Sequence, residues 1–208
     1  MYTPSAFRHD ALPELHRHIL ATRLAILVSH GPDGLEASHI PLLLDPNAGE
    51  FGTLHGHLAR ANPHWQALTA GEVMVIFPGV DAYISPGFYA AKAEHGKVVP
   101  TWNYETVHAY GQAEVFTDAQ RLLRLVSALT DRHEARQAQP WSVSDAPAEY
   151  IDGMLKAIVG FSIPIARLEG KRKLGQNRSD ADIQGVKAGL GASSDPGDQA
   201  LAAAMQNL

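Results

Sequence analysis

The chain has 208 residues, enough for one large domain or for one domain with a modest appendage. Hydrophobic residues make up 45% and charged residues 19%, which excludes a mainly disordered chain, and the formal charge of −5 excludes a global positive field for nucleic acid or an anionic membrane. The absence of cysteine excludes disulfides, thiolate nucleophiles, iron–sulfur clusters and cysteine-ligated zinc.

The first elements are expected to be a short helix and three strands. Residues 12–20 favour a helix, with Pro13 in its first turn. Strands are expected at 22–29, 35–44 and 50–57, separated by turn-forming residues at 31–34 and 45–49. Because short turns join these strands, we expect them to form an antiparallel meander.

The middle of the chain is expected to hold a helix, two strands and a long loop. Asn62-Pro63 is typical of a helix start, and the helix would run to about Ala70. Strands at 73–77 and 82–85 would flank a turn at Pro78-Gly79. Residues 86–100 would form a loop long enough to act as a lid or a binding loop.

The second half is expected to alternate long strands with helices. One strand would cover 102–116 with a bend at Gly111, and another 161–168, where Pro164 indicates an edge strand or a bulge. The expected helices are one opened by a capping box at 117–120, one over 147–158, and one capped by Ser179 that ends at Gly189.

The order of these elements favours one fold class. In the first half, strands follow one another without intervening helices, which favours a closed antiparallel barrel with peripheral helices over a doubly wound parallel sheet. We expect residues 1–190 to form this mainly β domain, and residues 191–208 to form a C-terminal tail in which a short helix is allowed.

Four segments combine aromatic residues, cations and glycine in a way that core packing does not require, at 54–65, 77–86, 98–108 and 171–178. Their runs GHLARANP, AYISP, VPTWNY and KLGQNR, with MYTP at the start and SHIP at 38–41, resemble the PaiB-like family of FMN-binding negative transcriptional regulators. The resemblance covers nearly the whole chain. It implies an antiparallel split β-barrel that binds FMN at the interface of a homodimer.

The chemistry of FMN suits these segments. A flat amphipathic ring and a phosphate call for an apolar pocket with aromatic faces and a few cations. Arg60 precedes the expected helix start, so its guanidinium and the helix dipole can converge on a phosphate. Trp102 and Tyr104 alternate on a strand and therefore share a face. With the resemblance, the candidate cofactor-binding residues are His39, His57, Arg60, Asn62, Tyr83, Ser85, Thr101, Trp102, Asn103, Tyr104, Lys173, Gln176 and Asn177.

Two positions depart from the family pattern. Gly87-Phe88 stand where Ser-Trp is expected, and Gly175 stands where Ser is expected. A contact between either position and the flavin or its phosphate would weaken FMN binding here.

Other interpretations of the candidate residues remain open at this stage. Arg60 and Lys173 are also consistent with cations exposed to solvent, and His39 with a strand histidine whose hydrogen bonds are satisfied within the protein. Trp102 and Tyr104 are also consistent with aromatic residues of the core or of a dimer interface. His55 and His57 lie at i and i+2, a spacing that suits two ligands of a metal with His64 or His39 as the third. Because no carboxylate stands at a supporting spacing, we expect no metal site. We expect the two histidines to line the polar edge of a pocket instead.

The function therefore has a leading hypothesis and alternatives. The leading one is an FMN-binding flavoprotein, either an FMN-dependent oxidoreductase or a redox-linked negative transcriptional regulator, with no catalytic residue of its own assigned. One alternative is a cofactor-free regulator that binds DNA or a protein partner. The run 171–173 supplies cations that could contact DNA phosphates, but the sequence shows no helix-turn-helix pattern beside it. The other is a haem-binding split-barrel protein, since histidines are plentiful. Without a signal peptide or a long apolar run, we expect a cytoplasmic protein that contacts no membrane.

Overall fold

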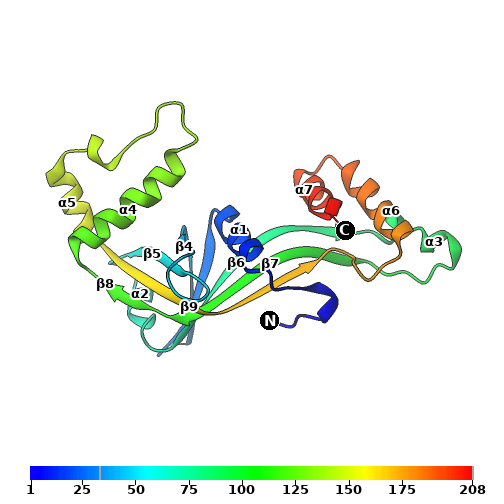
Figure 1. The fold of residues 1–208 in the computed structure, drawn as a ribbon, viewed down its shortest axis with the longest axis horizontal. Helices are drawn as coiled ribbons and strands as arrows, with labels where there is room; N and C mark the ends of the chain where they lie inside the picture. The colour runs from blue at the N-terminus through cyan, green and yellow to red at the C-terminus, as the bar shows by residue number, and fades with distance from the viewer. Residues whose placement is uncertain (33, 208) are drawn as a thin grey trace. The chain divides into compact units, whose positions relative to one another are not determined.

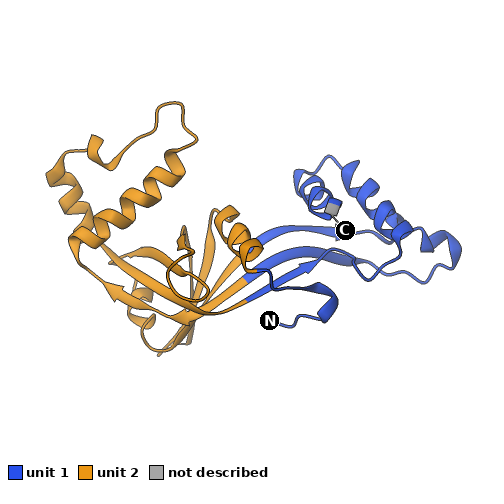
Figure 2. Cartoon of the chain, viewed as in Figure 1, with its two compact units in different colours: residues 1–11, 78–107, 169–208 blue, residues 12–77, 108–168 orange. Residues whose placement is uncertain are grey.

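A computed structural model describes residues 1–32 and 34–207 (Figure 1). Asp33, in the first expected hairpin turn, lies outside the described residues, as does the last residue of the expected tail. The chain divides into two compact units (Figure 2). Unit 1 comprises residues 1–11, 78–107 and the chain from Glu169 onward, and unit 2 comprises residues 12–77 and 108–168.

The expected class, mainly β with peripheral α, is confirmed (Figure 1). The strands are β1 (Arg8–His9), β2 (Ala25–Gly31), β3 (Gly34–Ile40), β4 (Leu43–Asp45), β5 (Thr53–Ala59), β6 (Glu72–Ile84), β7 (Thr101–Gln112), β8 (Glu114–Phe116) and β9 (Ile158–Lys173). Unit 2 holds the helices α1 (Leu12–Ala21), α2 (His64–Ala67), α4 (Ala119–Glu134) and α5 (Ala148–Lys156), and unit 1 holds α3 (Ala91–Glu94), α6 (Asp180–Gly191) and α7 (Pro196–Ala204). Hydrogen bonding orders the strands β3-β2-β6-β7-β9-β5-β4, while β1 and β8 pair with β9.

The first hairpin is confirmed, but the three-stranded meander is wrong. β2 and β3 pair antiparallel from Ala25 with Ile40 to Gly31 with Gly34. β5, however, pairs with β4 and β9 rather than with β3. Pro41 follows β3 directly and has no N–H to donate to a ladder, so the strand ends there and the chain begins a new pair.

The expected turn at Pro78-Gly79 is also wrong, because β6 runs without interruption from Glu72 to Ile84. The two segments that flank the supposed turn are consecutive parts of one strand. Pairing with neighbouring strands in the sheet has overridden the local turn preference of the Pro-Gly pair, as tertiary context commonly does for β structure.

β9 is longer than expected and lies inside the sheet order, between β7 and β5. The interpretation of Pro164 as the mark of an edge strand is therefore wrong. Pro164 pairs with Thr53 at the last position of the β5–β9 ladder, so its missing N–H falls where that ladder ends.

Other boundaries also differ in smaller ways, among them those of β7, α2 and α4. The expected strand over 102–116 is divided into β7 and β8, two residues after Gly111, where a Cβ would stand 2.2 Å from the carbonyl oxygen of Pro164. α2 is a single turn instead of reaching Ala70. α4 is capped by Asp118, whose carboxylate accepts the N–H of Arg121 at 2.7 Å, instead of by a capping box at Thr117.

The C-terminal part of the chain builds the core of unit 1. α6 begins at the expected cap, with the Ser179 hydroxyl accepting the N–H of Asp182. α7 contributes Leu201, which is fully buried, and Met205 follows it into the same core. The buried residues of this core are Ala82, Ile84, Tyr89, Leu174, Val186, Leu190, Leu201 and Met205. Among the helices of the described residues, none has both the length and the apolar character needed to cross a membrane.

Candidate functional site

A polar hollow in unit 2 collects three of the predicted cofactor-binding residues. It has a volume of about 420 Å³ and is lined by Ser38, His39, Ile40, Pro41, His57, Leu58, Ala59, Asn62 and Ile158. β3 supplies Ser38 and His39, β5 supplies His57, and Asn62 comes from the turn before α2. The hollow thus brings together His39, His57 and Asn62, three of the residues predicted to bind the cofactor.

His57 lines this hollow and has a side-chain atom without a hydrogen-bond partner. Its Nδ1 is buried and has no hydrogen-bond partner among the described residues. Burial also lowers the pKa of His57 below its ordinary value of 6.5, which favours the neutral ring at physiological pH. A buried polar atom without a partner costs free energy, and that cost is recovered when a ligand supplies the missing hydrogen bond.

A buried histidine supports the wall of the same hollow. His64 is fully buried, and its Nδ1 lies 2.8 Å from the hydroxyl of Ser38. Its Nε2 lies 2.9 Å from the hydroxyl of Ser29, which is also buried. Asn62 completes the cluster, since its Nδ2 donates to Ser38 at 3.2 Å and its Oδ1 accepts the N–H of His64 at 3.0 Å.

Sequence reasoning missed most of this cluster. The sequence motifs include Ser38 without giving it a role, the histidine spacing offers His64 only as a third metal ligand, and no motif indicates a role for Ser29. A usable signal is the polar residue Ser29 directly after the apolar run 24–28, at an inward-facing position of the strand, because a buried hydroxyl in a strand needs a partner.

Arg60 directly follows β5 and borders a different hollow of unit 2, of about 330 Å³, together with Asp152 and Lys156. Its Nε donates to the carbonyl oxygen of Lys156 at 2.7 Å, and its Nη2 to that of Ile158 at 3.2 Å. A guanidinium has five N–H donors, so these two bonds orient the group and leave donors for an anion. The following helix is a single turn, so its dipole adds little at this position.

The remaining nine predicted residues lie in unit 1. They are Tyr83 and Ser85 on and after β6, Thr101, Trp102, Asn103 and Tyr104 on β7, and Lys173, Gln176 and Asn177 at and after the end of β9. Trp102 and Tyr104 line a hollow of about 330 Å³, as their shared strand face predicts. Tyr83 meets Trp102 edge to face, with ring centroids 6.0 Å apart.

Several polar groups of this second set are already used within unit 1. The ammonium of Lys173 donates to the hydroxyl of Thr101 and the carbonyl of Trp102, both at 2.5 Å. Burial lowers the pKa of Lys173, and the neighbouring cations Lys171 and Arg178 lower it further. The amide of Gln176 bridges two backbone groups of its own turn, the N–H of Leu174 and the carbonyl of Arg172.

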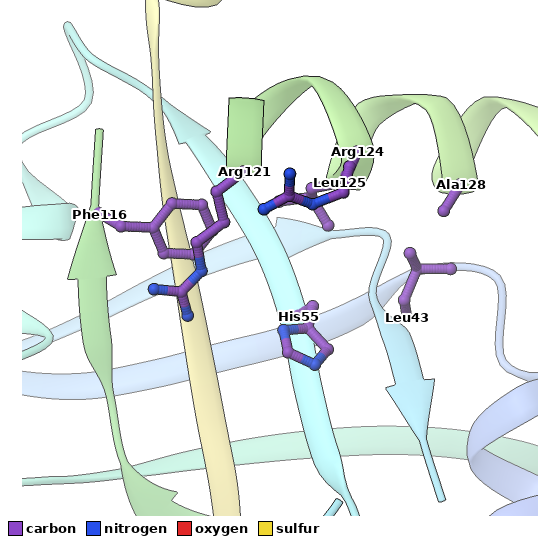
Figure 3. Close-up of a pocket in the computed structure, with 7 residues that line it drawn as sticks. All are labelled: Leu43, His55, Phe116, Arg121, Arg124, Leu125 and Ala128. Atoms are coloured by element: carbon purple, nitrogen blue, oxygen red, sulfur yellow. The ribbon is translucent and has the colours of Figure 1, made fainter. Parts of the chain in front are cut away.

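His55, the other histidine of the possible metal-binding pair, lines a separate hollow of about 340 Å³ in unit 2 (Figure 3). His55 on β5 borders it together with Arg121 and Arg124 from α4. Arg121 is engaged by Glu114, at 2.6 Å, and its guanidinium lies 3.8 Å from the centre of the Phe116 ring. Within residues 1–32 and 34–207, no cluster of three or more His, Cys, Asp or Glu residues is arranged to hold a metal.

Comparison with known proteins gives a family match and several relatives. Residues 1–167 match the family described as "Putative FMN-binding domain". The protease synthase and sporulation protein PAI 2 of Bacillus subtilis is 28% identical, over 100% of this chain and 97% of its own. An uncharacterised protein of Aspergillus fumigatus is 34% identical, over 91% of this chain and 90% of its own. The structure of an FAD and haem binding protein from Mycobacterium smegmatis superposes with a TM-score of 0.59 at 18% identity, over 88% of this chain and 80% of its own.

Proposed function

Because the chain belongs to the PaiB-like family of FMN-binding split-barrel proteins, we propose that it is a flavoprotein that holds FMN non-covalently and serves in electron transfer. Flavin supplies the redox chemistry itself, so the protein needs to bind, orient and shield it rather than to provide an acid–base pair. We place the cofactor at the unit 2 hollow.

The observation that carries this assignment is the unsatisfied Nδ1 of His57. His57 lines a hollow that also presents the hydroxyl of Ser38 and the amide of Asn62, and its Nδ1 has no hydrogen-bond partner among the described residues. The isoalloxazine ring carries oxygen and nitrogen atoms along one edge that match such groups, and apolar residues such as Leu58 complement its body. Arg60, which follows the lining residue Ala59 in the chain, is the cation that we assign to the phosphate.

The first experiment is the visible absorbance of the protein purified without added cofactor, followed by chromatography of the chromophore released by heat. We expect the two-band spectrum of oxidised flavin and a released species that migrates as FMN. FAD in its place would contradict the assignment of the cofactor. A Soret band would favour haem instead, and a colourless protein that takes up no added FMN would favour the cofactor-free regulator.

Arg60→Ala tests the phosphate position. We expect at least a tenfold weaker FMN affinity, because the charge-assisted hydrogen bonds to the phosphate are lost. Arg136→Ala, which removes an exposed arginine beyond the end of α4, is the matched control and should bind FMN like the wild type. Fluorescence titration of FMN measures both, with circular dichroism to show an intact fold. Unchanged affinity in Arg60→Ala would remove Arg60 from the site.

We infer further that the protein works as a homodimer. Trp102 is 55% exposed and Tyr83 is 47% exposed, although the two rings pack against each other. Exposed aromatic pairs are typical of surfaces that a partner covers. A second copy of the chain is the partner that the family resemblance implies.

We propose that any regulatory action proceeds through a protein partner rather than through DNA. The cations of the basic run 171–173 already have partners within unit 1. Lys171 is buried and donates to the carbonyl of Tyr2, and Arg172 pairs with Glu105. Lys173 is held by Thr101. A gel-shift assay with the promoter region next to its gene, at physiological salt, should therefore show no salt-sensitive complex. A complex that weakens steeply with salt would contradict this.

A further inference from the structure

The cluster behind the unit 2 hollow can exist in two proton arrangements. Burial lowers the pKa of His64 below its ordinary value of 6.5, which favours the neutral ring, with a proton on only one nitrogen, at physiological pH. Both nitrogens face serine hydroxyls, Ser38 on one side and Ser29 on the other, and each hydroxyl can donate or accept. The surroundings therefore satisfy either tautomer with the same heavy-atom positions.

The two tautomers present different groups to the hollow. When Nε2 carries the proton it donates to Ser29, and Nδ1 accepts the hydroxyl proton of Ser38, so Ser38 offers the hollow only a lone pair. When Nδ1 carries the proton, it and the amide of Asn62 both donate to Ser38. The lone pairs of that oxygen are then filled, and its O–H is free to donate into the hollow.

We propose that His64 is a positioning residue whose tautomer sets whether Ser38 donates or accepts a hydrogen bond at the cofactor, so that the hollow accommodates both redox states of the flavin. This inference rests on the proposed FMN binding. Uptake of two electrons from a reductant and two protons from solvent turns acceptor nitrogens of the flavin ring into N–H donors. A fixed donor would favour the oxidised ring alone, whereas the Ser38 hydroxyl can follow the change.

Ser29 allows a test that leaves the hollow untouched, because it lies behind His64 and is not among the lining residues. Ser29→Ala leaves Nε2 without a partner. A buried N–H without an acceptor is less tolerated than a bare lone pair, so the proton moves to Nδ1. Ser38 is then held as a donor, and the oxidised flavin is favoured over the reduced one.

The measurement is the dissociation constant of FMN in its oxidised state and in its dithionite-reduced state, with the midpoint potential of the bound flavin. In Ser29→Ala we expect the ratio of reduced to oxidised dissociation constants to rise about tenfold, which lowers the potential by about 30 mV for a two-electron couple. Ser29→Thr restores the hydroxyl and should return the ratio toward that of the wild type.

Ser162→Ala is the matched control. Ser162 is another buried strand serine of unit 2, bonded to Arg121 and Glu114 away from the hollow, and its loss should leave the ratio unchanged. If Ser29→Ala weakens both redox states equally, or neither, the cluster is only structural and the inference is overturned while FMN binding stands. If the wild type binds no FMN, the proposed function fails and the inference fails with it.

Discussion

At the scale of single residues, Gly175 explains one departure from the family pattern. It follows β9 in the turn that also holds Gln176, and its φ is +91°, in the region that only glycine adopts without strain. Where the family resemblance leads us to expect serine, this chain therefore needs glycine for its backbone. The backbone conformation therefore accounts for glycine at this position.

Gly175→Ser tests that explanation. We expect the free energy of unfolding to fall by about 1–2 kcal/mol, the usual cost of placing a side chain in the left-handed region. Urea denaturation measures the loss. Gly71→Ser is the control, since a Cβ there meets nothing within 4 Å and the backbone has no positive φ. Equal stability of the two variants would show that the turn relaxes to accept a side chain.

His64 also predicts a pH dependence at the residue scale. Burial lowers its pKa in the folded protein below 6.5, and burial does the same for His55 and His57. The unfolded chain then binds more protons than the folded one as the pH falls through 6.5. The stabilising effect of these neutral rings is full above pH 6.5 and is lost progressively below it.

We therefore expect the free energy of unfolding to be lower at pH 5.5 than at pH 7.5. The lowered pKa of His64 contributes to this slope, so His64→Asn should flatten it. Urea denaturation at the two pH values provides the measurement, and an unchanged slope in His64→Asn would assign it to groups other than His64.

At the scale of elements, α6 shows how the other departure is accommodated. Phe88 packs against this helix where two glycines leave room for it. A Cβ at Gly185 would stand 2.1 Å from the carbonyl oxygen of Phe88, and a Cβ at Gly189 would stand 2.3 Å from its ring. Phe88 thus belongs to the packing of unit 1, which gives its position a role independent of the flavin.

Gly185→Ala should destabilise the protein by about 1–3 kcal/mol, because the clash is with backbone that cannot swing aside. Gly191→Ala, in the last turn of the same helix, is the control. Its Cβ would meet nothing within 4 Å, so the higher helix propensity of alanine should stabilise by a few tenths of a kcal/mol up to about 1. Thermal melts report both, and opposite signs are the expected result.

At the scale of the whole molecule, the proposed homodimer predicts a stability that depends on protein concentration, since association stabilises the folded state by mass action. Light scattering coupled to gel filtration should give twice the 22.4 kDa of the chain. Trp102→Ala removes an exposed aromatic and should shift the mass toward the monomer with little change in secondary structure. A wild-type chain that stays monomeric at all concentrations would contradict the proposal.

The sequence by itself determined the features that depend on neighbours along the chain. The first helix, the first hairpin, the cap at Ser179 and the mainly β class all follow from local patterns of polarity, turn residues and helix caps. The family motifs also identified residues on both sides of one hollow, His39 and His57, although His39 precedes the turn at Pro41 and His57 lies on a separate strand.

Only the tertiary structure decided which strands pair and which polar groups are already satisfied. Residues far away in the sequence determine that β6 continues through Pro78 and that β5 pairs with β9. They also determine that Lys171 donates to the carbonyl of Tyr2. The same holds for the bonds of His64 to Ser29 and Ser38. Strand pairing and burial are properties of contacts between distant segments, and a pattern along the chain does not specify which distant segment supplies the partner.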